Sequence, residues 1–192
     1  MPKRCDRLIL ASRSPRRREL LANAGYEFEV IPPSDAAEAE APGGGDPAEL
    51  VARLACRKAA DVAGRISRGL VIGCDTVAEC GGQILGKPAG EDDARRMLET
   101  LSGRLHRVFS GLCLQRVPGG TPLVRVAVTT LRMDRLSKYE LDKYLAGRQW
   151  EGKAGAFGYQ DELDWVHIVE GSDSNVVGLP MELLDEMLGQ LK

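Results

Sequence analysis

Residues 8–18 read LILASRSPRRR, and this stretch decides the fold. Its apolar first part, residues 8–11, is typical of a buried strand, and Ser14 followed by Pro15 predicts the N-cap and first residue of a helix. Backbone N–H groups at a helix start bind anions, and guanidinium groups hold phosphate through charge-assisted hydrogen bonds. We therefore expect a strand, a hydroxyl-rich turn and a helix that together bind a phosphate chain.

The three arginines at positions 16–18 have a second interpretation, which is a solvated first turn of the helix. Cations are unfavourable at a helix N-terminus unless an anion neutralises them. Their placement therefore favours the phosphate interpretation.

The length and charge of the chain limit the class of protein. With 192 residues, of which 43% are hydrophobic, the chain can bury a core without disulfides, and we expect one domain over residues 1–192. The formal net charge of −2 argues against a general nucleic-acid binder, because no excess of positive charge is present to neutralise a phosphate backbone. The basic character is local.

Cysteine usage and hydropathy indicate the compartment. Five cysteines without a C-x-x-C pair, and only two histidines, argue against a disulfide framework or a zinc site. No apolar run approaches the roughly 20 residues that a membrane span needs, and residues 1–6 are not followed by a signal-like apolar segment. We expect a cytoplasmic protein with reduced thiols and no membrane contact.

Strand and helix patterns alternate along the chain, with hairpins among them. Helices are expected over residues 15–24, 46–64 and 91–101, from the capping box at Ser137, and from Pro180. Strands are expected over residues 8–11, 26–31, 70–77, 83–85, 106–115, 123–133 and 165–169. Residues 32–45, rich in Pro, Ala, Glu and Gly, are expected to form a loop. This order predicts an α/β fold with a mixed sheet rather than a purely doubly wound one.

Asp75 interrupts an apolar strand just after Gly73. A buried carboxylate is costly unless it is paired or binds a metal. The functional interpretation is a carboxylate that holds a metal or activates water beside the phosphates. The alternative is a strand-end aspartate that caps a turn.

Two lysines carry less specific patterns. Lys58 lies four residues after Leu54 and four before Val62, on the apolar face of its helix. A snorkelling lysine is the usual explanation of such a position. Lys87 follows Gly86 in the turn after the hairpin, and it is weak evidence alone because exposed lysines before turns are common.

Seven short motifs, taken together and in order, closely resemble the Maf family of nucleoside triphosphate pyrophosphatases. They are SRSPRR (12–17), LACRKA (54–59), GCDT (73–76), GKP (86–88), LSG (101–103), KAGAFGYQ (153–160) and VGLP (177–180). Each motif is moderately specific, and the ordered set is highly specific. The resemblance covers the chain from Leu8 to Leu188.

The resemblance implies a two-lobed fold like that of inosine triphosphate pyrophosphatases, with the nucleotide in a central cleft. It implies hydrolysis between the α- and β-phosphates, which releases a nucleoside monophosphate and pyrophosphate (diphosphate). A divalent metal cation, Mg or Mn, is the implied cofactor, and a homodimer is the implied assembly. A role in clearing canonical or modified pyrimidine nucleotides from the nucleotide pool follows from this activity.

The resemblance also assigns roles to individual residues. Ser12, Arg16 and Arg17 would hold the triphosphate. Asp75 matches the proposed general base and would also bind metal, while Lys58 and Lys87 would neutralise charge in the transition state.

Substrate preference within the family follows three positions, which here are Arg16, Thr76 and Gln160. The residues at all three positions match those of the branch that acts on dTTP and UTP. The branch that acts on 7-methyl-GTP tends to carry Trp, Gln and Glu there, and that activity is the first alternative. A neutral Gln amide both donates to and accepts from a pyrimidine edge, whereas a carboxylate only accepts.

The second metal-binding carboxylate depends on how the loop is aligned with the family. Counting from Phe28 places Ala36 and Ala37 where the family usually has an acidic pair. Counting back from Leu50 assigns the role to Glu38, with Glu40 as its rival.

A nucleotide-binding regulator of cell division is the second alternative. Such a protein would keep the fold and bind without turnover. Loss of Asp75 or Lys58 would favour it, and both residues are present.

Overall fold

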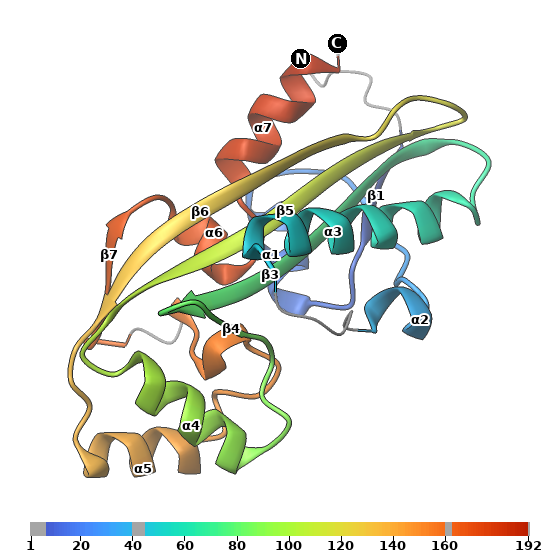
Figure 1. The fold of residues 1–192 in the computed structure, drawn as a ribbon. Coiled ribbons are helices and arrows are strands. Elements are labelled where there is room, and N and C mark those ends of the chain that lie inside the picture. The colour runs from blue at the N-terminus through green and yellow to red at the C-terminus, as the bar shows by residue number, and fades with distance from the viewer. Residues whose placement is uncertain (1–6, 40–44, 160–162, 192) are drawn as a thin grey trace. The chain divides into compact units, whose positions relative to one another are not determined.

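The computed structural model describes residues 7–39, 45–159 and 163–191 (Figure 1). The chain forms two compact units. Unit 1 takes its residues from the ranges 1–75, 110–127 and 178–192, and unit 2 from the ranges 76–109 and 128–177. In the described ranges, no helix is both long and apolar enough to cross a membrane.

The strands of the described residues form a mixed seven-stranded sheet in the order β2-β1-β3-β5-β6-β7, with β4 paired to β3. The strands are β1 (Leu8–Ala11), β2 (Glu29–Val30), β3 (Gly69–Cys80), β4 (Gln83–Leu85), β5 (Leu105–Val117), β6 (Leu123–Met133) and β7 (Val166–Glu170). β1 pairs in parallel with β2 and β3, whereas β3 with β4 and β6 with β7 are antiparallel. The predicted mixed-sheet α/β fold is confirmed.

The helices of the described residues are α1 (Pro15–Asn23), α2 (Asp35–Glu38), α3 (Pro47–Ala63), α4 (Glu91–Leu101), α5 (Lys138–Ala146), the 3₁₀ turn η1 (Ala154–Ala156), α6 (Asp173–Val177) and α7 (Met181–Gln190). The predicted ones, α1, α3, α4, α5 and α7, begin and end close to the predicted positions. Helix α4 matches its predicted range, and its apolar face is buried. The capping box at Ser137 and Glu140 is complete, because each side chain accepts from the other residue's backbone N–H.

Local structure differs from prediction in several regions, and two of the differences are α6 and η1, where no helix was predicted. The predicted strand over residues 26–31 reduces to Glu29–Val30. The predicted loop over residues 32–45 contains α2, whose Ser34 hydroxyl accepts from Ala37 N. A four-residue helix is too short to give a sequence periodicity, so its contacts rather than its pattern maintain it.

Helix α3 packs directly on the sheet within unit 1, where Figure 1 shows it lying across β3 and β5. A Cβ atom at Gly73 would lie 2.2 Å from the carbonyl oxygen of Ala55, and one at Gly111 would lie 2.2 Å from that of Val51. Glycine at both positions lets the helix backbone touch the strands. The short distance between α3 and the sheet therefore depends on the lack of a side chain at Gly73 and at Gly111.

Unit 2 has its own core around α4, α5 and the adjoining strands. His106 on β5 is only 2% exposed, and its ring meets that of Phe157 edge to face at 5.2 Å between centroids. Burial lowers the pKa of His106 to about 4, so its imidazole is neutral at physiological pH.

Candidate active site

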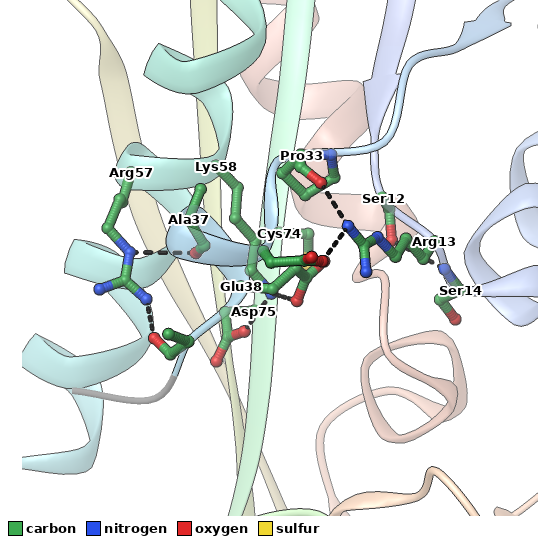
Figure 2. A network of polar contacts seen from close by, with 12 residues as sticks. Ser12, Arg13, Ser14, Pro33, Ala37, Glu38, Arg57, Lys58, Cys74 and Asp75 are labelled. Atoms are coloured by element: carbon green, nitrogen blue, oxygen red, sulfur yellow. Dashed lines mark hydrogen bonds and ion pairs between the residues drawn. The ribbon is translucent and has the colours of Figure 1, made fainter. Parts of the chain in front are cut away.

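Lys58 lies between two carboxylates in unit 1 (Figure 2). Its Nζ is 2.7 Å from Asp75 Oδ1 and 2.9 Å from Glu38 Oε2. The Lys58 side chain is 4% exposed, against 14% for Asp75 and 22% for Glu38. The ammonium therefore does not snorkel to solvent. It is a buried cation shared by two partly buried anions.

The path of α3 explains how a lysine reaches this depth. Gly73 lets the helix backbone approach β3 at Ala55 and Ala59. Lys58 lies between these two alanines in the chain and is buried with them. Asp75 lies two residues after Gly73 on that strand. The same close approach thus sets the distance between the lysine and Asp75.

Glu38 ends the short helix α2, and bonds from α3 hold that helix. Arg57 Nε donates to the carbonyl of Ala37 at 3.0 Å, and its Nη2 donates to the carbonyl of Ala39. The carboxylate of Asp61 accepts from the backbone N–H and hydroxyl of Ser34 at 3.0 and 2.7 Å. These two bonds from Ser34 are the main reason that the pKa of Asp61 lies below its ordinary value.

Arg13 holds α2 from the opposite side (Figure 2). Its Nη2 donates to the carbonyl of Pro33 at 3.0 Å and to Asp35 Oδ1 at 2.6 Å. Arg13 and Arg57 both lie inside motifs quoted above, but the sequence analysis assigned no role to either of them. The signal available was their place in those motifs, because their partners lie about 20 residues away in the chain.

The strand–turn–helix junction forms as predicted. Ala11 pairs with Gly73, so Ser12 and Asp75 follow the carboxyl ends of neighbouring parallel strand segments. That edge of a parallel sheet is where α/β proteins bind ligands. Ser14 is the N-cap of α1 by position, and its backbone N–H donates to Ser12 Oγ at 3.2 Å.

Arg17 is buried, and it bonds to protein. Its Nε donates to the carbonyl of Gly178 at 2.7 Å, and its Nη1 donates to the carbonyl of Cys74 at 2.8 Å and to Ser12 Oγ at 3.3 Å. The guanidinium thus ties α1 to the strand residue before Asp75. Arg16 is partly exposed and Arg18 is exposed, so the three arginines have three environments.

The remaining predicted residues belong to unit 2 or lie outside the described ranges. Thr76 directly follows Asp75 and is partly buried, and Lys87 is exposed in the turn after β4. Gln160 and Glu40 lie outside the described residues. The structure therefore brings together Ser12, Arg17, Glu38, Lys58 and Asp75.

Unit 2 contains an open pocket of about 600 Å³. Its walls are residues 88–91, together with residues 145, 146, 148 and 150–152. Among the site residues predicted from the sequence, none lines it, although Pro88 directly follows Lys87.

The sequence model of a family described as "Maf-like protein" matches residues 7–191. The chain belongs to the Maf family. This Maf chain is 53% identical over 184 residues to a dTTP/UTP pyrophosphatase of Rhodopirellula baltica, covering 95% of this chain and 81% of that protein. It is 44% identical over 178 residues to a dTTP/UTP pyrophosphatase of Anaeromyxobacter dehalogenans, covering 91% and 89%.

The Maf chain also resembles solved structures at low sequence identity. The Ham1 protein of Staphylococcus aureus matches with a TM-score of 0.54 and 12% identity, over 97% of this chain and 100% of that one. A HAM1 protein from Coxiella burnetii matches with a TM-score of 0.51 and 15% identity, over 96% and 98%. The likeness concerns the fold.

The donor chemistry of the Maf site fits a hard divalent cation. In the part of the chain that the structure describes, no group of three or more His, Cys, Asp or Glu side chains could hold a metal. Glu38 and Asp75, however, both reach the single ammonium of Lys58. Mg²⁺ is commonly held by one or two carboxylates together with substrate phosphates. Two carboxylates at this spot meet that requirement once phosphate is present.

Proposed function

We propose that this chain hydrolyses dTTP and UTP between the α- and β-phosphates, releasing the nucleoside monophosphate and pyrophosphate. The observation that carries the proposal is the Glu38–Lys58–Asp75 cluster at the strand edge that also carries Ser12 and the start of α1. The names of relatives up to 53% identical support the choice of reaction and substrate.

The start of α1 binds the phosphates in this proposal. The start of α1, the Ser12 hydroxyl and the partly exposed Arg16 present positive charge and donors in one place. Arg17 contributes a second cation there, and its bonds to Ser12 and Cys74 orient the turn.

The carboxylate of Asp75 acts as the general base. It accepts a proton from the attacking water as the new O–P bond forms and the bond to the bridging oxygen breaks. The leaving pyrophosphate takes the electron pair of that bridging bond. Lys58 and Lys87 supply positive charge for the anion that develops, since phosphoryl transfer depends mainly on positioning and charge neutralisation.

Glu38 and Asp75 are the residues that would hold a divalent cation, Mg²⁺ or Mn²⁺. When bound, the cation would neutralise phosphate charge and polarise the reacting phosphoryl group. Lys58 meanwhile holds both carboxylates close together before substrate arrives.

Arg16, Thr76 and Gln160 carry the preference for a pyrimidine. A Gln amide both donates and accepts, and a buried site whose polar groups stay unpaired rejects the wrong base strongly. Gln160→Glu removes the donor and should therefore reduce dTTP turnover.

The test is a panel of nucleoside triphosphates with separate detection of pyrophosphate and orthophosphate. We expect dTTP and UTP to be the best substrates, CTP to be poorer because its amino group reverses one donor–acceptor position, and pyrophosphate to be the product. Faster turnover of 7-methyl-GTP than of dTTP would move the chain to the other branch of the family. Orthophosphate release would refute the reaction.

Two further properties belong to the same proposal. We place the reaction in the cytoplasm because none of the four described cysteines, Cys56, Cys74, Cys80 and Cys113, forms a disulfide. The homodimer implied by family resemblance is tested by analytical ultracentrifugation.

Tight nucleotide binding without turnover would instead favour the regulator of cell division.

A further inference from the structure

Lys87 belongs to a short turn in unit 2. The turn comprises Gly86, Lys87 and Pro88, and it follows β4. Lys87 is exposed, and the backbone of this turn sets the position from which its side chain extends.

A bond from a distant loop holds that backbone. The N–H of Gly155 donates to the carbonyl of Gly86 at 3.0 Å, directly before Lys87. Gly155 is buried within the 3₁₀ turn η1, which belongs to the same unit.

Gly155 has no room for a side chain. Its φ is +68°, which is a left-handed conformation, and a Cβ atom there would lie 3.0 Å from Ala78 Cβ and 3.1 Å from Phe157 Cε1. Ala78 is fully buried in β3. Phe157 is 4% exposed and packs against the buried ring of His106. Neither neighbour can withdraw without disturbing the core of unit 2.

We infer that Gly155 is a positioning residue for Lys87, because its confined backbone holds the carbonyl of Gly86. This inference rests on the proposed function, in which Lys87 neutralises charge in the transition state. Displacing the Gly155 backbone then weakens turnover by misplacing the ammonium, without touching the nucleotide.

Gly152, which directly precedes the KAGAFGYQ motif and lies three residues before Gly155, provides a matched control. Its φ is also +68°, but a Cβ atom at Gly152 would meet nothing within 4 Å. Gly152→Ala and Gly155→Ala therefore carry a similar backbone strain, and only the second creates the two close contacts. We expect kcat for dTTP to fall at least tenfold in Gly155→Ala and to stay within about twofold in Gly152→Ala.

A double-mutant cycle with Lys87→Ala tests the route of the effect. If Gly155 acts through Lys87, Gly155→Ala changes kcat less than twofold once Lys87 is already alanine. A merely structural role would give the same tenfold loss in both backgrounds, and that result overturns the inference. If Gly155→Ala does not fold, Phe157→Leu replaces it, because this substitution relaxes one wall around Gly155. Its kcat is measured with Lys87 present and with Lys87→Ala, and a loss that disappears in Lys87→Ala supports the inference, whereas an equal loss in both overturns it.

Amide hydrogen exchange gives a readout independent of activity. The amide of residue 155 should exchange slowly in the wild type and in Gly152→Ala, and at least tenfold faster in Gly155→Ala. Unchanged exchange would overturn the inference while leaving the proposed function intact. A wild-type protein that releases no pyrophosphate from dTTP overturns the proposed function, and this inference with it.

Discussion

Replacing Lys58 by methionine removes the cation shared by Glu38 and Asp75 while keeping a side chain of similar length. Breaking a buried ion pair by removing one partner costs about 3–5 kcal/mol, because the other charge is left buried without compensation. The side chains of Asp75 and Glu38 retain 14% and 22% exposure, so water solvates them in part. We therefore expect the lower end, a loss of about 3 kcal/mol in the free energy of unfolding at pH 7.

Urea denaturation measures this loss. With a slope near 2 kcal/mol per molar urea, a loss of about 3 kcal/mol lowers the midpoint by about 1.5 M. Arg65→Met is the control, because the Arg65–Asp61 pair is more exposed and its loss should cost at most about 1 kcal/mol.

A deficit below about 1 kcal/mol for Lys58→Met at pH 7 would refute the proposed charge arrangement.

Three further outcomes are expected. Asp75→Asn should remain folded and bind nucleotide, with kcat reduced about 10²–10⁴-fold as for loss of a general base; steady-state kinetics with circular dichroism check this, and near wild-type turnover would remove Asp75 from the mechanism. Arg16→Ala should weaken turnover of dTTP far more than Arg18→Ala, because Arg18 is exposed; equal effects in the two variants would mean that the arginines act only as a diffuse charge. Burial lowers the pKa of His106 to about 4, so the stability that depends on its neutral form is present above about pH 6.5 and is lost as the pH falls toward 4. Acid titration of the free energy of unfolding should show that His106→Leu removes up to about 3 kcal/mol of this loss. Identical titration curves for the variant and the wild type would contradict it.

The sequence predicted the elements whose signals are local. The junction at residues 8–18, the helix Glu91–Leu101 and the strand Leu123–Met133 were expected at or near their observed positions. Each combines a clear period with a cap or turn residue.

Contacts between distant parts of the chain could not be read this way. Helix α2 depends on Arg13 and Arg57, each about 20 residues from its partners, and its four residues give no period. Arg17 bonds to the carbonyl of Gly178, 161 residues later. The resemblance to the Maf family indicated that Glu38, Lys58 and Asp75 carry charge chemistry, but not that one ammonium joins both carboxylates.

The glycines beneath α3 affect how a mutational map of this protein would look. In a scan of all single substitutions scored by turnover, Gly73 and Gly111 should rank beside Lys58 and Asp75, although neither glycine has a side chain to offer a nucleotide. A parallel score for protein abundance in the cell separates the two kinds of position. Asp75→Asn should lose turnover at normal abundance, whereas Gly111→Ala, which drives a methyl group into the backbone of Val51, should lose both.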